Sequence, residues 1–378
     1  MHVSHEALPD WRVEKCAISG ARNGHDVRFA GVKSNNNYKR IFSEIYDLSW
    51  SAKARFGIPF YSRCLEKQLN RIIGKAKPDI VHAHNIFSAK LVSKLDIPLV
   101  YDDHEYWPLQ AKLLKEISTE RTHDDSKPTR QFIKAYERIK RKLQNDYAVR
   151  LWTRWEEEVV SSHPTITVSY KIAEEMQALV GNTGKIFIVP NYPLLSEVRT
   201  VHMPTPQKGL SSVYAGGDAN NIEKYPHLNR DGLPEVFCNN DVGNLTLIGS
   251  NGPTSPRVRY TGYLTRETMY DEMAKHSVGL IPFKKHWSHP YLNPNKAYEY
   301  AQVGLYVLCT SSLTSVQRTL KHNCSTFEDF ESLVSQLEYF KNNPEDLYTK
   351  RVKMFEYAHD KLIWERNEQE IARAYQKC

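Results

Sequence analysis

Residues 294–310 read PNKAYEYAQVGLYVLCT and join a predicted helix to a predicted buried strand. Pro294 suits the first turn of a helix, because its missing N–H would have no intrahelical partner there. Gly304 is typical of a helix end, and the apolar run 305–309 is typical of a strand inside a sheet. We therefore expect a helix followed directly by a buried strand, which is the alternation of an α/β domain.

Two charged side chains lie in the first turns of this predicted helix. Its free N–H groups and the positive end of its dipole attract phosphate, and Lys296 adds a positive charge. Glu299 lies one turn further on and can accept hydrogen bonds from sugar or ribose hydroxyls. Two interpretations stay open on these residues alone: a cradle for a nucleotide sugar, or a capped helix whose Lys and Glu only face solvent.

The composition is that of a globular protein with room for two domains. The chain has 378 residues, of which 40% are hydrophobic and 25% are charged. Its 6 cysteines are scattered without metal-ligand spacing, so we expect free thiols in a reducing compartment, with neither a zinc site nor a disulfide framework. Because no window resembles a membrane span and no signal-peptide pattern is present, we expect a cytoplasmic protein.

The positive charge is concentrated in one segment. The formal net charge is +7, and residues 127–154 hold nine basic against two acidic side chains. Apolar residues from Phe132 to Trp155 recur every three or four positions, which predicts an amphipathic helical insertion at about 127–158 with a basic opposite face. Such a helix either binds an anionic membrane surface or packs on its own domain. In a cytoplasmic protein, that surface would be the inner face of the membrane. No nucleic acid is expected, because the basic residues occupy one helix without aromatic stacking groups.

The first 196 residues alternate between predicted strands and helices and form the first predicted domain. Parallel sheets bind ligands at the carboxyl ends of their strands. The group DDHEYW at 102–107 follows one such strand, and the setting of His104 there favours function over a structural role. His5 and Arg12 lie in or beside the first loop, where loop polarity and helix capping are the alternative. Strands are expected at 1–4, 26–31, 78–84, 97–101, 165–169 and 186–190, and helices at about 10–21, 60–76, 86–95 and 171–179.

The second half of the chain restarts the same alternation. Prolines and a lack of periodicity mark residues 197–208 as a linker, and residues 209–350 form the second predicted domain. Its first strand runs into Gly216-Gly217, a turn that can bring backbone N–H groups close to a ligand or can be an ordinary turn. Strands are expected at 210–214, 245–249, 258–264, 278–283 and 305–309, and a helix at 266–275. After residues 294–310, helical segments are expected to the end of the chain, the last at about 344–375.

The order and spacing of these motifs resemble the retaining glycosyltransferases of family 4. That family has the GT-B fold, in which two Rossmann-like domains with parallel sheets face each other. The resemblance implies that residues 351–378 form a helix that crosses back to the first domain. The segments that carry it run along nearly the whole chain: 10–14 with 24–27, 78–84, 101–105, 167–169, 189–191, 261–263 and 294–304.

The resemblance also implies roles for residues and a reaction. Lys296 and the turn at Gly216 and Gly217 would face the diphosphate of a UDP- or GDP-sugar, Glu299 would hold its ribose, and His104 would lie near the transferred sugar. The acceptor would be a glycan or a lipid-linked saccharide, and no cofactor or metal would be required. The implied site comprises His104 and Glu105 as catalytic residues; Gly216, Gly217, Gly262, Tyr263, Asn295, Lys296 and Glu299 on the donor side; and His5, Arg12 and His84 on the acceptor side.

Two departures from the family pattern leave alternatives open. Tyr291 stands where the family often has a second Glu, eight positions before Glu299. The Arg and Lys pair that follows the first strand of the second domain has no obvious match, with Lys224 and Arg230 as substitutes. The alternatives are an altered sugar preference, a nucleotide-sugar epimerase of the same fold, and a non-catalytic protein that binds a nucleotide sugar or a partner.

Overall fold

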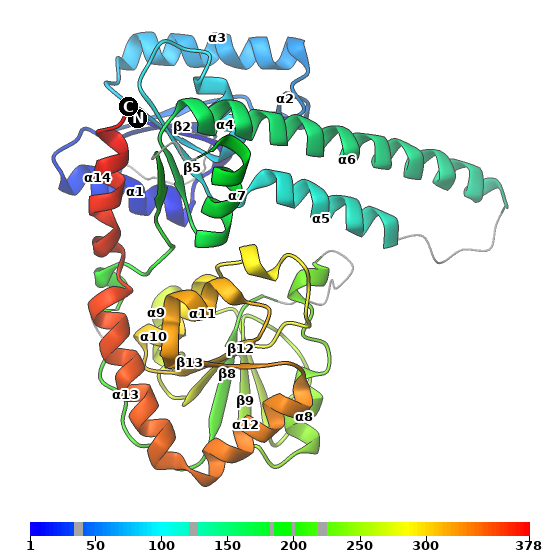
Figure 1. Cartoon of the computed structure of the whole chain (residues 1–378), viewed down its shortest axis with the longest axis vertical. Coiled ribbons are helices and arrows are strands. Elements are labelled where there is room, and N and C mark those ends of the chain that lie inside the picture. The colour runs from blue at the N-terminus through cyan, green and yellow to red at the C-terminus, as the bar shows by residue number, and fades with distance from the viewer. Residues whose placement is uncertain (34–40, 121–127, 182–184, 199–200, 218–224) are drawn as a thin grey trace. The chain divides into compact units, whose positions relative to one another are not determined.

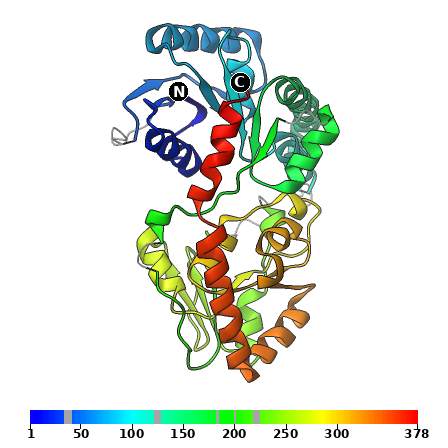
Figure 2. The same ribbon diagram turned by 60° about the vertical axis from the view of Figure 1, so that its left-hand side comes forward.

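The computed structural model describes residues 1–33, 41–120, 128–181, 185–198, 201–217 and 225–378. The chain divides into two compact units, each a parallel sheet covered by helices (Figures 1 and 2). The first unit is Met1–Pro190 with Asn367–Cys378, and the second is Asn191–Arg366. This division falls after Pro190 and Arg366, whereas the sequence predicts a linker at 197–208 and a last segment from 351. The two-sheet fold class is confirmed.

The sheet of the first unit has seven parallel strands in the order β3-β2-β1-β4-β5-β6-β7. From β1 the order runs outward in both directions, so the winding reverses between β1 and β4. Ligands of such sheets bind at the carboxyl ends of the strands beside this reversal. The strands are β1 (His2–Ala7), β2 (Arg28–Val32), β3 (Glu44–Asp47), β4 (Val81–His84), β5 (Leu99–Asp103), β6 (Thr165–Thr167) and β7 (Ile186–Ile188).

The last helix of the chain belongs to the first unit, as the sequence predicts. Ser19 Oγ donates a hydrogen bond of 3.0 Å to Glu368, and the Tyr375 hydroxyl lies 2.9 Å from His82 Nδ1. The prediction of one continuous helix to Tyr375 is wrong. The helix that begins at Pro344 ends at Lys361, and a new helix begins at Glu368. The helices of the unit are α1 (Trp11–Arg22), α2 (Ala52–Arg55), α3 (Pro59–Ala76), α4 (Asn85–Val92), α5 (Trp107–Glu120), α6 (Pro128–Ser162), α7 (Tyr170–Val180) and α14 (Glu368–Tyr375).

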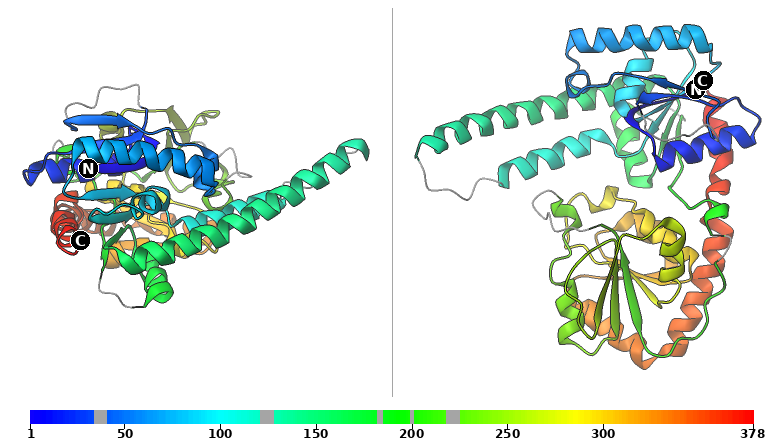
Figure 3. Two further views of the ribbon diagram at one scale, coloured as in Figure 1. Left: turned by 90° about the horizontal axis from the view of Figure 1, so that it is seen from above. Right: turned by 180° about the vertical axis from the view of Figure 1, so that it is seen from behind.

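The basic segment forms half of a helical hairpin. Helix α6 packs along α5, a helix that the sequence does not predict, and the pair extends away from the sheet of its unit (Figure 3). The apolar stripe changes its surroundings along α6: Ile139, Leu143 and Tyr147 are 60%, 65% and 52% exposed, whereas Trp152 is buried. Residue 127 lies outside the described residues. Within the described residues, every helix is either too short or too polar to span a bilayer.

The sheet of the second unit has six parallel strands in the order β10-β9-β8-β11-β12-β13, with the reversal between β8 and β11. Its strands are β8 (Ser211–Ala215), β9 (Asn244–Ile248), β10 (Val258–Gly262), β11 (Val278–Ile281), β12 (Tyr306–Thr310) and β13 (Cys324–Phe327). Its helices are α8 (Leu233–Asn239), α9 (Arg266–Met273), α10 (Asn295–Gln302), α11 (Thr314–Leu320), α12 (Phe330–Asn342) and α13 (Pro344–Lys361). Strand β13 interrupts a region that the sequence predicts as helical.

Residues 294–310 form the predicted helix and strand. Pro294 is the cap that precedes α10, one position earlier than the sequence suggests, and Tyr298 and Tyr300 bury the helix against the sheet. Gly304 has a φ of +65°, and a Cβ there would lie 2.8 Å from the ring of Pro204, so only glycine fits without strain. Strand β12 follows and is fully buried. The first turn of α10 is thereby held beside the carboxyl ends of β8 and β11.

Candidate functional site

Tyr214 contacts two cations near the carboxyl end of β8. Lys296 Nζ, in the first turn of α10, donates a hydrogen bond of 2.9 Å to the Tyr214 hydroxyl and lies 4.0 Å from the centre of its ring. The guanidinium carbon of Arg230 lies 4.3 Å from the same centre. Burial alone would raise the pKa of Tyr214, but the charges of Lys296 and Arg230 outweigh it and the pKa is lowered. Two cations beside one helix N-terminus favour binding of a multiply charged anion.

The Gly216-Gly217 turn packs directly against these cations. Arg230 donates hydrogen bonds of 3.0 Å to the Gly217 carbonyl and 3.2 Å to Ser250 Oγ. A Cβ at Gly216 would lie 2.8 Å from Lys296 Nζ, so the glycine leaves room for the lysine. The Gly216 N–H donates to Ile248, whereas a Cβ at Gly217 would meet nothing within 4 Å. Gly216 therefore contributes space rather than a hydrogen-bond donor.

Glu299 is held by an arginine that the sequence does not single out. Its carboxylate lies 3.1 Å from Arg266 Nη2, and Arg266 also pairs with Glu197. The side chain of Glu299 is only 9% exposed. Burial would lower the pKa of Arg266, but Tyr270 and the two carboxylates outweigh this and raise it. Arg266 thus keeps its charge and fixes the orientation of Glu299.

The remaining donor-side predictions lie around the same strand ends. Gly262, at the end of β10 with a φ of +67°, donates a hydrogen bond of 3.1 Å to the Ser250 carbonyl. Asn295 is exposed at the start of α10, and Tyr263 is 89% exposed. Tyr291, at the position where the family often has a second Glu, is half-buried in a short 3-10 helix before α10. Lys224 lies outside the described residues.

In the first unit, Arg12 binds the buried carboxylate of Asp102 at the end of β5. Its Nη2 and Nε donate hydrogen bonds of 2.8 and 3.1 Å to Asp102 Oδ1, and its Nη1 donates one of 2.7 Å to the Val189 carbonyl. Burial would raise the pKa of Asp102, but Arg12 and the neighbouring His104 and His82 hold it well below its usual value. The structure therefore turns Arg12 toward Asp102 and the protein interior.

Three histidines form a hydrogen-bonded chain beside Asp102. His2 Nδ1 lies 2.9 Å from His84 Nε2, and His84 Nδ1 lies 3.0 Å from His104 Nε2. Burial lowers the pKa of His2 strongly and that of His84 to about 3. Burial would also lower the pKa of His104, but Asp102 outweighs it and the pKa is raised. Of the three rings, His104 is therefore the one whose protonated form its surroundings favour, and its side chain is 11% exposed.

The same cluster contains side chains at metal-ligand spacing. The ligand atoms of His84, Asp102 and His104 lie within 4.8 Å of one another, as do those of Cys16, His82 and Asp102. Asp102 belongs to both sets and is already neutralised by the guanidinium of Arg12. A divalent cation there would place further positive charge against a buried cation, so the contacts favour a hydrogen-bonded chain rather than a metal centre.

His5 is fully buried among aromatic rings near the carboxyl end of β1. Its ring centre lies 4.8 Å from that of Phe87 and 5.7 Å from that of Trp107. Burial and then Arg55 lower the pKa of His5 to about 3, so its contact of 3.4 Å with Glu6 is not an ion pair at neutral pH. Glu105, predicted as catalytic, is exposed on the surface.

Several buried nitrogens around His5 have no hydrogen-bond partner within the described ranges. They are both ring nitrogens of His5, Nε1 of Trp50 and of Trp107, and Nε of Arg55. A buried donor without an acceptor costs about 1–3 kcal/mol. Both indoles and the guanidinium are N–H donors, so a ligand rich in oxygen acceptors, such as a sugar or a phosphate, would satisfy them.

Acid should destabilise the first unit, because His5 and His84 are buried as neutral rings. The pKa of each is about 3 in the folded chain, lowered mainly by burial from 6.5. Between about pH 6 and 4 the unfolded chain therefore binds protons that the folded chain does not, and stability falls by about 1.4 kcal/mol per pH unit for each histidine. Urea unfolding at several pH values should show this fall, and His5→Phe should make it shallower. An equal slope in parent and variant would contradict the assignment.

Comparisons with known proteins agree with this architecture. Residues 16–192 match the family model described as Glycosyltransferase Family 4. Sucrose-phosphate synthase (tll1590) from Thermosynechococcus elongatus superposes with a TM-score of 0.71 at 13% identity, covering 100% of this chain and 98% of that chain. Anabaena Alr3699/HepE in complex with UDP gives 0.69 at 11% identity, with 100% and 99% covered. A glycosyltransferase from Rickettsia africae ESF-5 gives 0.66 at 12%, with 99% and 97% covered. The search of curated protein sequences finds no match.

Proposed function

We propose that this chain, a GT-B protein whose residues 16–192 match the model of Glycosyltransferase Family 4, transfers a hexose from a nucleotide diphosphate sugar to an acceptor with retention of the anomeric configuration. The match of residues 16–192 to the family model and the GT-B fold support its assignment as a glycosyltransferase of class EC 2.4 that uses a nucleotide sugar. The hexose, the retention and the nature of the acceptor are the proposal.

The observation that carries the donor assignment is the pair of cations on Tyr214. Departure of the nucleoside diphosphate places negative charge on the leaving oxygens, and preorganised cations stabilise that charge. Lys296 and Arg230 supply them, and Arg230 takes the place of the cation pair that the sequence pattern lacks. Glu299, oriented by Arg266, accepts hydrogen bonds from the ribose hydroxyls. Gly262 and Tyr263 at the end of β10 lie beside the nucleobase.

The first unit supplies the acceptor side in this proposal. Asp102 favours the protonated form of His104, which can donate a hydrogen bond to the transferred sugar, and His84 Nδ1 lies 3.0 Å from His104 Nε2 and can accept from it. The unpartnered N–H donors around His5 bind oxygens of the acceptor. Glu105, on the surface of the first unit, remains a candidate catalytic residue. Arg12 acts indirectly, by holding the carboxylate of Asp102 in place.

A panel of nucleotides tests the donor assignment. The related structure named Alr3699/HepE is described with UDP and with UDP-glucose, so we propose a UDP-sugar as the donor, with a GDP-sugar as the alternative. A ligand present at 100 times its Kd raises stability by about 2.7 kcal/mol, which shifts the unfolding midpoint by several degrees. We expect such a shift with UDP-glucose and a smaller one with ADP- or dTDP-sugars. Equal, negligible shifts with all of them would contradict the donor site.

The α5–α6 hairpin supports peripheral membrane binding at the cytoplasmic face. Apolar Ile139 and Leu143 are exposed on α6 beside Lys140, Arg141 and Lys142. Each basic residue near an anionic bilayer contributes about 1 kcal/mol. Co-sedimentation with vesicles containing phosphatidylglycerol should exceed that with phosphatidylcholine vesicles, and Leu143→Glu should reduce it. Equal sedimentation with both vesicle types would contradict this part of the proposal.

Tyr291 favours one alternative, a non-catalytic protein that binds a nucleotide sugar. Without the second carboxylate, contacts to the donor sugar differ from the family pattern. Under this alternative the nucleotide panel gives the same shifts, but UDP release stays at the level of a blank across a broad set of acceptors. Acceptor-dependent UDP release excludes it.

A further inference from the structure

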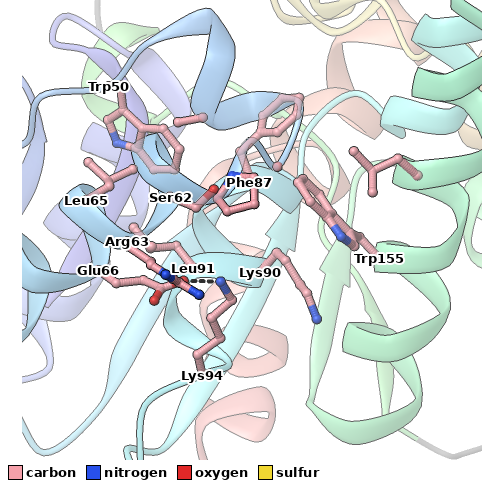
Figure 4. Close-up of a pocket in the computed structure, with 14 residues that line it drawn as sticks. Trp50, Ser62, Arg63, Leu65, Glu66, Phe87, Lys90, Leu91, Lys94 and Trp155 are labelled. Carbon is pink, nitrogen blue, oxygen red and sulfur yellow. Dashed lines mark hydrogen bonds and ion pairs between the residues drawn. The ribbon is translucent and has the colours of Figure 1, made fainter.

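A cavity of about 400 Å³ lies in the first unit between α3, α4 and α6 (Figure 4). Its volume is within the range of about 300–1,000 Å³ that small-molecule sites occupy. The histidine chain and Asp102 do not line it. Apolar and aromatic side chains form most of its wall: Trp50, Leu65, Phe87, Leu91, Leu151 and Trp155.

Three cations and one carboxylate also line the cavity. Arg63 is exposed, and no ion pair joins it to any residue of the described ranges. Lys94 pairs with Glu66, and Lys90 pairs with Glu158, which does not line the cavity. The lining therefore combines an excess of positive charge with apolar side chains, which complements an anionic head group attached to a hydrocarbon chain.

The apolar surface continues from the cavity toward the hairpin. Gly57 and Pro59 line the cavity, and their neighbours Ile58 and Phe60 are 41% and 70% exposed. Tyr147 of α6 is 52% exposed and donates a hydrogen bond of 3.4 Å to the Phe56 carbonyl. Exposed apolar side chains thus border both the cavity and the proposed membrane-binding helix, so a lipid chain would have an apolar route between them.

The cavity also shares its wall with the proposed acceptor site. Phe87 lines the cavity and packs against His5, with 4.8 Å between ring centres. Trp50 also lines the cavity, and its ring centre lies 6.1 Å from that of His5. A ligand in the cavity would therefore touch the rings that hold His5 in place.

We propose that this cavity holds the hydrocarbon chain of an anionic lipid whose phosphate pairs with Arg63, and that this lipid is the anchor of the sugar acceptor. The second half of the statement rests on the proposed function, whereas binding of the lipid does not. The occupant follows from the apolar lining, the positive charge of Arg63 and the exposed apolar side chains beside the cavity.

Binding of monomeric alkyl phosphates to the full chain tests the site. Hexyl, octyl and decyl phosphate are titrated below their micelle concentrations by calorimetry. Each buried methylene should tighten Kd by about fourfold until the cavity is full. Alkyl glucosides of equal length, which lack the charge, should bind at least about tenfold more weakly. Affinity that does not depend on chain length, or that is equal for both head groups, would overturn the proposal.

Two variants locate the binding. Arg63→Ala should weaken decyl phosphate by about tenfold, whereas Lys67→Ala, an equal loss of charge from an exposed position on the same helix, should not. Ser62→Trp should fill the cavity and abolish chain-length dependence. UDP binding by the second unit and the thermal midpoint report folding of each variant. If Ser62→Trp does not fold, the affinities of Arg63→Ala and Lys67→Ala for decyl phosphate still test the site. Equal losses of affinity in those two variants would overturn the proposal.

Further experiments distinguish a lipid from free phosphate as the ligand. They also separate lipid binding by the cavity from the proposed sugar transfer. Inorganic phosphate should not compete with decyl phosphate, because the chain supplies the affinity; effective competition would overturn the site. Chain-length-dependent binding without sugar transfer to any lipid acceptor would support the cavity and contradict the proposed function. Transfer to water-soluble glycans in parent and Ser62→Trp alike, with no alkyl phosphate binding, would overturn the cavity and leave the function standing.

Discussion

Lys296→Met should lower kcat/KM for sugar transfer by roughly 10²–10³, the usual loss when one group that stabilises the charge of a transition state is removed. Methionine keeps most of the length of the side chain and removes only its charge and its hydrogen bond of 2.9 Å to Tyr214. The leaving diphosphate would then face Arg230 alone. Steady-state release of UDP in the presence of acceptor measures the effect.

Lys353→Met is the matched control, because Lys353 is an exposed lysine on α13 of the same unit. It should leave kcat/KM within about twofold of the parent, as expected for a surface substitution. The pKa of Tyr214 should also respond: without Lys296, the phenol loses the first of the two cations that lower it. An unchanged kcat/KM in Lys296→Met would remove Lys296 from the donor site.

Asp102→Leu should destabilise the first unit by about 3–5 kcal/mol, because it leaves the buried guanidinium of Arg12 without its carboxylate. Arg12 is 3% exposed and Asp102 is 0% exposed, so water cannot replace either partner. Urea unfolding of the parent and of the single variants Asp102→Leu and Arg12→Met measures each loss.

The double variant Arg12→Met with Asp102→Leu tests the cause of this loss. Apolar side chains in place of a buried ion pair are often neutral or stabilising. The double variant should therefore be more stable than either single variant, although His82, which lies 3.1 Å from Asp102, still loses its partner. Losses that simply add would show that the two side chains act independently, which the hydrogen bonds of 2.8 and 3.1 Å between them contradict.

Much of the fold follows from local patterns in the sequence. The helix and strand at 294–310 are found because Gly304 and the apolar run 305–309 are strong local signals. Strands β3 and β13 are missed because both lie at the edge of a sheet, where a strand needs no continuous apolar run. Helix α5 is missed because the polar group at 102–107 resembles a loop, although Trp107 already begins the helix.

The candidate site is less predictable because its contacts join distant residues. His82 and His84 lie two positions apart, so they share a face of β4, and this period could have identified His82 beside His84. Their contact with His2 depends on the register of β1 against β4, in which His2 pairs with His82. Arg266 reaches Glu299 from another helix, and no spacing in the sequence indicates that pair.

The role of Arg230 is also not predictable from the sequence alone. The sequence offers Lys224 and Arg230 equally as substitutes for the missing cations. In the structure, the guanidinium of Arg230 lies 4.3 Å from the ring centre of Tyr214, which is near the carboxyl end of β8. Cations that are far apart in sequence thus meet on one tyrosine, which only the folded chain reveals.

In the proposed donor site, Lys296, Arg230 and the start of α10 bind the diphosphate of a nucleotide sugar. Calorimetric titration of the full chain with UDP and with UMP tests this diphosphate binding. Each charge-assisted hydrogen bond to the second phosphate contributes about 1.5–3 kcal/mol, so UDP should bind at least roughly 100-fold more tightly than UMP, and Lys296→Met should reduce this ratio by about tenfold or more. Equal affinities for UDP and UMP in the parent chain would contradict the account.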